Sequence, residues 1–402
     1  MSNPGKPKLI RKINRALLIQ EIRAKQLLTN SDLIKSTGLS RRTINLILSS
    51  LEEKEIVQRD GFGESTKEGG KRPVIYKFNP DAFFTIGVIV RERFMGVGVS
   101  NLNGEIICSE FIKISWDDDN VEVINHMITN IKSIIEKSKK PINKFLGVGI
   151  GLPGLIDYKE GTVKLITRHV KWKDMKLVEM LQNELSLKVL IDNENLVRTL
   201  GEKWFGMAKG VENFVTLMTT INGIGCGVVI KNEIYRSINS LGGEIGQIKL
   251  NFPGRKIKDF LDYEEIIGEK NINEIIIKNK SNKLFEESDL KRIYLENNKV
   301  ELFELFESFN KRDKFSKIII EEISEYFVLL IIIIICTYDP ELIIIHGVFS
   351  LLEDSYFENI KEIVENSLFP QIDKKFVIKR SLKTKEMGIL GAASMVFDIV
   401  PI

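Results

Sequence analysis

Two helix-start signals stand close together near the N-terminus, and they constrain the fold of this region more than any other feature of the chain. Thr29 can cap a helix whose first turn contains Asp32, and Ser40 can cap a second helix. Gly38 lies between them and can end the first of the two. Two helices joined by a short glycine-containing turn are typical of a helix-turn-helix. We predict that its second helix ends near Glu53.

A further helix is predicted before this pair, because apolar residues between positions 13 and 27 recur at helical spacing. Leu27 is the last member of that apolar stripe, whereas Leu18 and Ile22 fall off it. The stripe is expected to face the core of the domain, and the two residues beside it predict that a second side is covered as well.

After the pair, residues 56–59 and 74–78 have strand-like composition and predict a β-hairpin wing. The loop between them carries Lys71 and Arg72 beside two glycines, which suits contact with a phosphate backbone or a minor groove. A merely flexible linker is the alternative. Together with polar residues at the start of the second helix, these form the predicted DNA-binding set: Ser40, Arg41, Arg42, Thr43, Asn45, Lys71 and Arg72.

Charge is distributed unevenly along the chain. The first 80 residues contain 16 Lys and Arg against 8 Asp and Glu, whereas the remaining residues contain 42 against 47. A basic N-terminal segment joined to a mildly acidic body favours a nucleic-acid-binding module attached to a second domain. We therefore expect a winged helix over residues 1–80 and a second domain over residues 81–402.

The spacing of the cysteines and histidines argues against a disulfide-stabilised protein and against a His/Cys metal site. Cys108, Cys226 and Cys336 lie far apart, so no disulfide framework is expected, and no His/Cys spacing predicts a metal cage. The most apolar stretch, residues 326–338, is too short to span a membrane, and residues 1–15 do not resemble an export signal. These features predict a cytoplasmic protein.

The acidic body alternates strands and helices and is predicted to be α/β. Residues 225–234 faintly echo residues 96–106, which hints at a duplicated α/β unit. Strands and helices are both read from apolar runs bounded by turn residues. The predicted strands are 83–90, 94–100, 105–114, 187–191, 214–220, 342–346 and 376–378, and the predicted helices are 318–337, 353–366 and 388–396.

Several glycine-rich and acidic motifs occur along nearly the whole chain. They are Thr-Gly-Leu-Ser-Arg-Arg-Thr (37–43), Gly-Gly-Lys-Arg-Pro (69–73), Gly-Leu-Pro-Gly-Leu-Ile-Asp (151–157), Asp-Asn-Glu-Asn (192–195), Leu-Gly-Glu-Lys-Trp-Phe-Gly (200–206), Gly-Ile-Gly-Cys-Gly (223–227), Gly-Gly-Glu-Ile-Gly-Gln (242–247) and Gly-Ile-Leu-Gly-Ala-Ala (388–393). In this order they resemble the ROK family (repressor, open reading frame, kinase), and within it the xylose-repressor-like regulators with an added winged helix. The resemblance implies an actin-like, ribonuclease-H-type domain of two lobes, about 81–195 plus 387–402 and about 196–386, with a sugar in the cleft between them.

The chain departs from the kinases of that family where ATP would bind. Their phosphate-binding Asp-x-Gly-x-Thr turn corresponds to residues 89–93 here, with Ile89 at the Asp position and Arg91 at the glycine position. Their catalytic Asp falls at Glu194, whose extra methylene would misplace a general base. The zinc-binding cysteines of the family have no counterpart in residues 256–262. We therefore expect no catalysis, no metal and no cofactor.

The resemblance also implies a sugar site. Carboxylates and amides can accept hydrogen bonds from sugar hydroxyls. The alternative is that the candidate residues are ordinary turn and cap residues, and this alternative is strongest for Gln247 and Glu264. The predicted sugar-binding residues are Asn193, Glu194, Glu244, Gln247 and Glu264.

The sequence thus predicts a sugar-responsive transcriptional repressor that binds a palindromic DNA operator as a homodimer, or as a larger homo-oligomer. An active ATP-dependent sugar kinase with a DNA-binding domain is the main alternative. An activator, or a regulator that senses a partner protein, is a third. The identity of the sugar does not follow from these residues.

Overall fold

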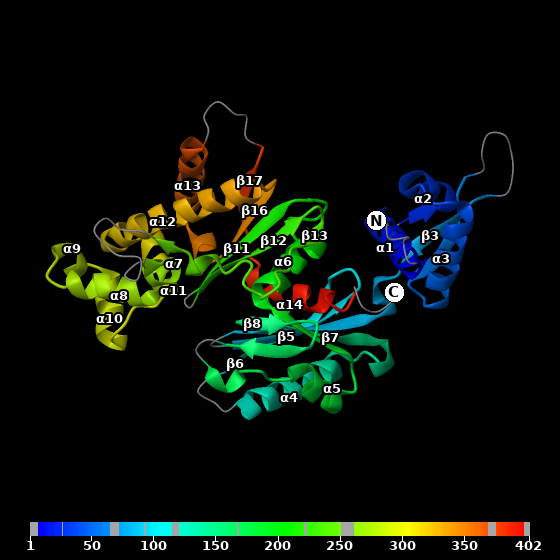
Figure 1. Cartoon of the computed structure of the whole chain (residues 1–402), viewed down its shortest axis with the longest axis horizontal. Coiled ribbons are helices and arrows are strands. Elements are labelled where there is room, and N and C mark those ends of the chain that lie inside the picture. Colours follow the sequence, from blue (N-terminus) through cyan, green and yellow to red (C-terminus); the bar gives the residue numbers. More distant parts are fainter. Residues whose placement is uncertain are drawn as a thin grey trace. The chain divides into compact units, whose positions relative to one another are not determined.

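The computed structural model describes residues 7–25, 27–64, 72–91, 94–114, 120–166, 169–220, 223–250, 261–368 and 375–397 (Figure 1). The chain divides into two compact units. Unit 1 comprises residues 1–150, 176–191 and 392–402, and unit 2 comprises residues 151–175 and 192–391. The domain and lobe boundaries predicted from the sequence stay a prediction beside this division.

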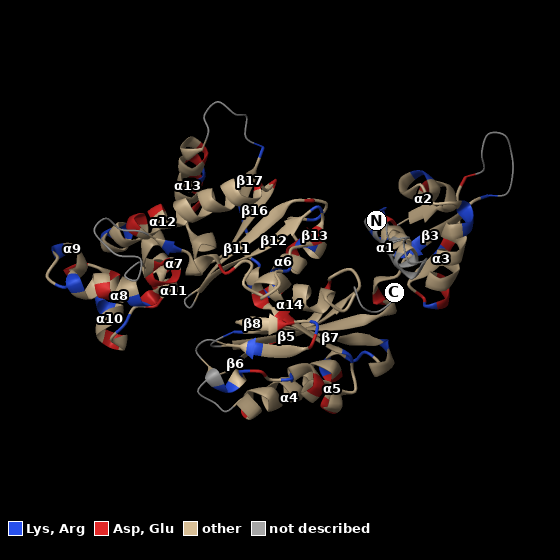
Figure 2. Ribbon diagram, viewed as in Figure 1, with Lys and Arg blue, Asp and Glu red and all other residues tan. Residues whose placement is uncertain are grey.

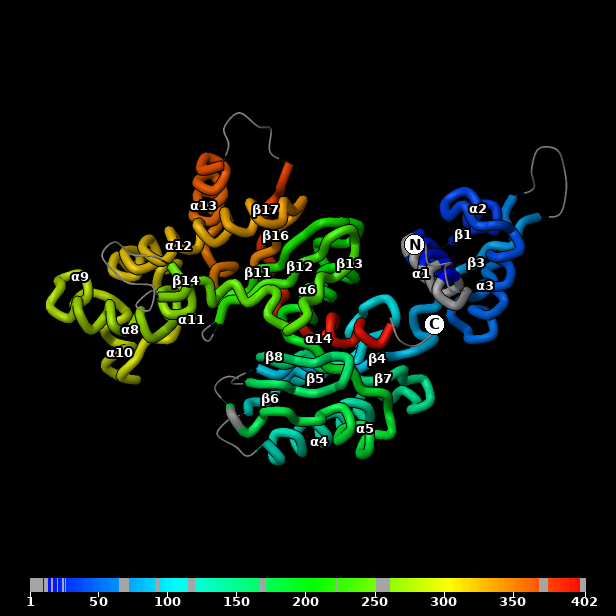
Figure 3. Tube along the Cα trace, in the orientation of Figure 1, coloured from blue at the N-terminus to red at the C-terminus, as the bar shows by residue number. Residues whose placement is uncertain are grey.

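The N-terminal part of unit 1 is a winged helix. Its helices are α1 (Pro7–Lys25), α2 (Asn30–Thr37) and α3 (Arg41–Glu53), and its strands are β1 (Leu27–Thr29), β2 (Val57–Phe62) and β3 (Val74–Phe78). The strands form an antiparallel sheet in the order β1-β3-β2. The short strand β1, labelled in Figure 3, was not predicted.

The predicted caps of the helix pair are confirmed. Thr29 and Asp32 form a capping box at the start of α2, and Gly38 ends α2 with a φ of 68°. The Ser40 hydroxyl accepts a hydrogen bond from the backbone N–H of Thr43 at the start of α3. These contacts involve residues within one helical turn of one another, which is why the sequence predicts them.

For α1, the predicted covering of a second side at Leu18 and Ile22 is confirmed, and the predicted burial of Leu27 is wrong. Leu18 and Ile22, which fall off the predicted stripe, are fully buried, whereas Leu27 is 51% exposed and belongs to β1. The α1 helix ends at Lys25, so Leu27 does not share its helical spacing. Leu18 and Ile22 pack into the apolar core of the winged helix, together with Leu33 and Ile44, as expected for a second covered side.

Each unit contains a five-stranded sheet. The first has the order β10-β7-β4-β5-β6, and the second has the order β13-β12-β11-β16-β17. In the first, β4 (Phe84–Val90), β5 (Phe94–Asn101) and β6 (Ile106–Lys113) are antiparallel, and β7 (Phe145–Leu152) and β10 (Val189–Asn193) complete the sheet. Helices α4 (Asn120–Ser138) and α5 (Leu177–Leu185) lie along one face of it (Figure 1).

The second sheet repeats this arrangement. An antiparallel group of β11 (Phe214–Thr220), β12 (Gly223–Ile230) and β13 (Glu233–Ile234) is extended by β16 (Leu342–Gly347), which runs parallel to β11 and to β17 (Val377–Arg380). The matching strand order confirms the predicted duplication. The helices of this part are α6 (Glu194–Phe205), α12 (Lys314–Tyr338), α13 (Asp354–Ser367) and α14 (Thr384–Ser394).

A group of short helices between β12 and α12 was not predicted. They are α7 (Tyr263–Ile267), α8 (Glu269–Lys278), α9 (Lys283–Glu286), α10 (Asp289–Asn297) and α11 (Leu302–Asn310). The long apolar helix α12 buries Phe327 and Ile331 in the core that these helices share with the second sheet. No helix of the described residues is long and apolar enough to span a membrane. The remaining strands form two small pairs: β8 (Leu155–Asp157) with β9 (Thr162–Leu165), and β14 (Lys249–Leu250) with β15 (Leu261–Asp262).

Candidate functional site

The first turn of α6 holds a buried ion pair. Arg198 lies one turn after Glu194, and its Nη1 is 3.0 Å from the Glu194 carboxylate. The Arg198 side chain is 2% exposed and that of Glu194 is 12% exposed. The Arg198 Nε also donates to the carbonyl oxygen of Thr384, the first residue of α14, at 3.3 Å. The carboxylate is therefore held by a cation that is itself tied to a second helix.

Glu244 is presented by a tight glycine-rich turn. Gly243 has a φ of 95°, and a Cβ at this position would collide with the carbonyl oxygen of Cys226. A Cβ at Gly246 would lie 2.6 Å from the carbonyl oxygen of Ile224. Only glycine can occupy both places without displacing strand β12, so the backbone around Glu244 lies directly against that strand.

Glu264, near the start of α7, faces the same strand. Its Oε1 accepts a hydrogen bond from the backbone N–H of Ile224 at 3.2 Å, and its Oε2 accepts one from Nε2 of Gln247 at 2.8 Å. A Cβ at Gly246 would also approach the Glu264 side chain. Gln247 thus positions Glu264 beside the turn that carries Glu244.

The three carboxylates interact electrostatically. Burial, together with the nearby charges of Glu264 and Glu194, raises the pKa of Glu244 to about 7. The structure thus brings together four of the five predicted sugar-binding residues, and we call Glu194, Glu244, Glu264 and Gln247 the carboxylate cluster. Fixed carboxylates of this kind can accept hydrogen bonds from several hydroxyl groups at once, and a protonated Glu244 can also donate one.

Asn193, the fifth predicted residue, lies beside the cluster as the N-cap of α6. Its Oδ1 accepts from the backbone N–H of Asn195 at 2.8 Å, and its Nδ2 donates to the carbonyl oxygen of Gly154 at 2.9 Å. Both ends of the amide therefore hold backbone groups. A direct contact between Asn193 and a sugar stays a prediction.

Asn195 is a polar residue that sequence reasoning missed. It follows Glu194 on α6 and packs against β12, where a Cβ at Gly225 would collide with its amide nitrogen. Its buried Oδ1 has no hydrogen-bond partner among the described residues. The sequence signal for Asn195 was its place in the Asp-Asn-Glu-Asn run. A second amide beside the cluster offers another acceptor for a hydroxyl group of a ligand.

The loop that leads to Glu244 is anchored at two points. Arg236 forms an ion pair with the buried carboxylate of Asp192 and lies 4.1 Å from the centre of the Tyr158 ring. Ser240 donates to the carbonyl oxygen of Ile156 at 3.0 Å. Burial raises the pKa of Asp192 even though Arg236 opposes that effect. These contacts hold the loop against the β8–β9 hairpin.

A second buried ion pair lies on the other end of α6. Nε2 of His346, on β16, is 3.2 Å from the carboxylate of Glu202, and both side chains are almost fully buried. Nδ1 of His346 is 3.3 Å from the Thr384 hydroxyl. Burial acts to raise the pKa of Glu202, but the interactions of its carboxylate with His346, with the backbone N–H of Met207 and with Ser381 together outweigh that effect and lower it. Thr384 therefore links both buried pairs of α6.

Five of the seven predicted DNA-binding residues lie at the start of α3. Arg41, Arg42 and Asn45 are exposed, and Ser40 and Thr43 join their side-chain hydroxyls at 2.9 Å in the cap. The Asn45 Oδ1 accepts a hydrogen bond from Asn30 at 2.9 Å. In the wing, Arg72 is exposed, and Lys71 lies outside the described residues.

Residues 89–93, which are predicted not to form an ATP-binding turn, run from the end of β4 toward β5. Ile89 is fully buried within β4, and the backbone N–H of Arg91 donates to Phe94 across the start of the hairpin. Positions 92 and 93 lie outside the described residues. The described residues contain no group of three or more His, Cys, Asp and Glu side chains that could hold a metal ion.

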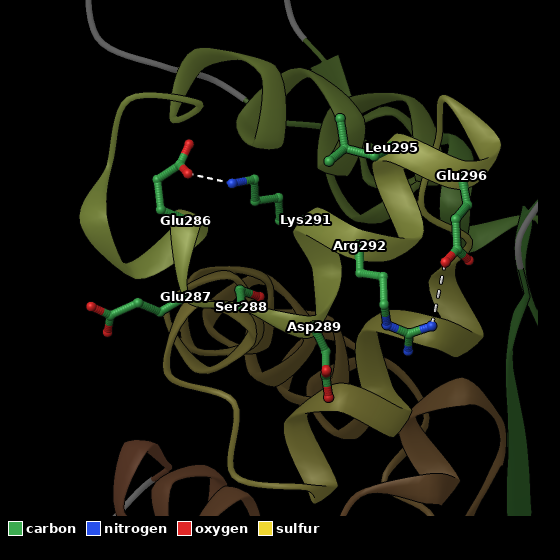
Figure 4. A pocket seen from close by; sticks show the side chains of 8 residues that line it. All are labelled: Glu286, Glu287, Ser288, Asp289, Lys291, Arg292, Leu295 and Glu296. Carbon is green, nitrogen blue, oxygen red and sulfur yellow. Dashed lines mark hydrogen bonds and ion pairs between the residues drawn. The ribbon is translucent and has the colours of Figure 1, made fainter.

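A shallow pocket between α9 and α10 lies apart in the sequence from these sites (Figure 4). Its charged side chains pair locally: Lys291 with Glu286, and Arg292 with Glu296 at 3.6 Å. Acidic and basic residues are interspersed over this group of helices (Figure 2). Local pairing of this kind is typical of a solvated surface.

The chain is similar to known proteins along nearly its whole length. Residues 95–399 match the ROK family. The sequence is 25% identical to a xylose repressor of Caldicellulosiruptor bescii over 98% of both chains, and 25% identical to a glucokinase of Thermotoga maritima over 77% of this chain and 96% of the glucokinase. The crystal structure of a ROK-family transcriptional regulator, a homologue of the E. coli MLC protein, has a TM-score of 0.79 and 18% identity and covers 97% of both chains. The predicted fold class, an N-terminal winged helix with a two-lobed α/β domain, is confirmed.

Proposed function

Since this chain belongs to the ROK family, we propose that it is a transcriptional repressor that leaves its DNA operator when a neutral sugar binds at the carboxylate cluster. Its sequence is similar to those of xylose repressors over nearly the whole chain, and this similarity supports the assignment as a regulator of that kind. The winged helix would bind DNA through the outward face of α3, and a homodimer would match a palindromic operator. The names of these relatives make xylose the first sugar to test.

The observation that carries this proposal is the ion pair between Arg198 and Glu194. The resemblance places Glu194 where the kinases of the family have their catalytic Asp. A general base must be free to take a proton from the sugar hydroxyl, and a carboxylate held by a buried guanidinium is less available for that step. It can still accept a hydrogen bond with its remaining lone pairs. The pair supports sugar binding without phosphoryl transfer.

The charge of the cluster indicates which sugars would bind. Three carboxylates, Glu194, Glu244 and Glu264, interact there. Arg198 pairs with Glu194 and so offsets the charge of one of them. A phosphate or carboxylate on the ligand would be repelled. We therefore infer a neutral sugar rather than a sugar phosphate or a sugar acid.

Release of DNA follows from linkage. A sugar can weaken DNA binding only if it binds more tightly to the arrangement that does not bind DNA. Removing a sugar contact should therefore remove the response and leave DNA affinity unchanged. Glu244→Gln is suited to this test because it keeps the size of the side chain while removing its charge.

The experiment starts with duplexes that the full-length protein enriches from a randomised DNA pool. Binding to these duplexes would be followed by fluorescence anisotropy during titration with xylose, other neutral sugars and their phosphates. We expect a neutral sugar to release the parent protein and the phosphates to have no effect. Glu244→Gln should bind the duplex normally and ignore the sugar, while Glu233→Gln, at an exposed position on β13, should behave like the parent.

Three results would contradict the proposal. Failure to enrich any duplex would contradict the DNA-binding function. Release by a sugar phosphate alone would contradict the ligand class. ATP-dependent phosphorylation of a sugar that Glu194→Ala abolishes would favour the kinase.

A further inference from the structure

Leu46 is an exposed apolar side chain on the helix that we expect to enter the DNA groove. It lies in the second turn of α3, and 67% of its surface is exposed. The apolar residues that α3 buries are Ile44, Leu48 and Leu51. Leu46 therefore lies outside the core-facing stripe, and the fold of the winged helix does not account for an apolar residue here.

Its neighbours identify the face to which it belongs. Arg42 lies one turn before Leu46, so their side chains share one side of the helix. Arg41, Asn45 and Ser49 are exposed as well. Of these, Arg41, Arg42, Asn45 and Leu46 lie in the N-terminal half of the second helix of the helix-turn-helix, which is the part that contacts base edges in the major groove.

The Asn45 amide is partly engaged within the protein. Its Oδ1 accepts the hydrogen bond from Asn30 on α2, so the amide is held toward that helix. Bidentate recognition of adenine requires both the oxygen and the nitrogen of the amide. Asn45 is therefore less suited to that role than its residue type indicates. The neighbouring Leu46 is exposed and apolar, so it can make only apolar contacts with a base.

We propose that Leu46 reads the 5-methyl group of a thymine in each half of the operator. The inference rests on the proposed DNA-binding function. The base edges of the major groove offer one apolar group to an apolar side chain, which is the thymine methyl. Burying one methyl group against Leu46 corresponds to about a fourfold change in affinity.

The test uses the full-length protein and a duplex that it enriches from a randomised DNA pool. Each thymine of that duplex is replaced in turn by deoxyuridine, which removes only the methyl group. For the parent protein we expect affinity to fall about fourfold at one thymine in each half-site. Leu46→Ala should bind the original duplex more weakly and show no further loss at that uracil.

Leu27→Ala is the matched control. It makes the same change at another exposed apolar position of the winged helix, 51% exposed and outside α3. It should keep the uracil profile of the parent. Neither leucine is buried, so both variants should unfold at the temperature of the parent, which thermal unfolding would verify.

Two results would overturn the inference and leave the proposed function in place. In the first, the parent binds the enriched duplex tightly but no uracil lowers its affinity. In the second, Leu46→Ala shows the same loss of affinity at each uracil as the parent. If this variant also has a different oligomeric state without DNA, Leu46 belongs to a contact between protein chains. Failure to enrich any duplex would overturn the inference and the proposed function together.

Discussion

The guanidinium of Arg198 and the carboxylate of Glu194 form an ion pair at 3.0 Å that is almost entirely removed from solvent. Arg198 also reaches the carbonyl oxygen of Thr384 at the start of α14. One cation therefore neutralises a member of the carboxylate cluster and ties α6 to α14. Buried pairs of this kind are costly to break, because the remaining charge loses its partner where little water can replace it.

Arg198→Met should lower the thermal stability of the protein. Methionine has a similar reach but no charge, so Glu194 would be left without its cation, at a cost of about 3 kcal/mol in the free energy of unfolding. Thermal and urea unfolding would measure the loss. Combining Arg198→Met with Glu194→Gln should recover part of it, because no unpaired charge then remains.

Lys311→Met provides the matched control for that change. Lys311 pairs with Glu307 at 2.8 Å with the same spacing of one helical turn, but both side chains are at least half exposed. Its replacement should cost less than about 0.5 kcal/mol. Equal losses in the two variants would contradict the importance of burial for the Arg198 pair.

Glu244 should make stability depend on pH in the neutral range. Its pKa is about 7 in the folded protein against the usual 4.5, so the folded state binds this proton more tightly than the unfolded chain does. The free energy of unfolding should therefore fall as pH rises from 4.5 to about 7, and the penalty should be fully present above pH 7. Glu244→Gln should remove it and gain up to about 3 kcal/mol over the parent at high pH.

Unfolding curves between pH 4.5 and 8 would check this prediction. The difference between Glu244→Gln and the parent should be small at the acidic end and grow toward the alkaline end. Glu233→Gln, which alters an exposed carboxylate, should show no such trend. A constant difference across the range would show that Glu244 keeps its usual pKa.

The Glu202–His346 pair should act in the opposite sense. The pKa of Glu202 is lowered, so its contribution to stability is present above the usual 4.5 and is lost as pH falls through the lower value in the folded state. Glu202→Gln should therefore be less stable than the parent at neutral pH, and the gap should narrow in acid. Acid unfolding monitored by circular dichroism would measure both curves, and a gap that widens in acid would contradict the assignment.

DNA binding should separate base contacts from phosphate contacts. Arg42→Ala should cost about 1–3 kcal/mol at one base pair and relax the preference there. Lys71→Ala should weaken binding to all sequences alike and reduce the slope of affinity against salt by about one. Competition with single-base variants of the enriched duplex at several salt concentrations would distinguish the two effects, and interchanged behaviour would contradict the predicted roles.

Sequence reasoning was most successful where the contact partners are near in the chain. The caps at Thr29 and Ser40 are local hydrogen bonds, and β11 and β3 match their predicted ranges because each is a short apolar run between turns. It was least successful for the short helices between β12 and α12, whose apolar faces have meaning only against a core assembled from distant segments. The exposure of Leu27 is another such case, since α1 ends at Lys25 and Leu27 belongs to β1, which pairs with β3.

The candidate site shows the same division. The residue types Glu194, Glu244 and Glu264, and the spacing of Glu194 and Arg198 by one helical turn, were present in the sequence. The hydrogen bonds of a helix cap and the residues of a tight turn lie within a few positions of one another, so the sequence by itself determined the helix caps and the glycine turn before Glu244. It also determined the basic character of the N-terminal segment, which is a matter of composition. Only the tertiary structure decided that these carboxylates meet, that Arg198 is buried against Thr384 and that the Glu244 proton is held more tightly. Burial and Coulomb interaction depend on which groups are near in space, and folding brings those groups together from segments far apart in the chain.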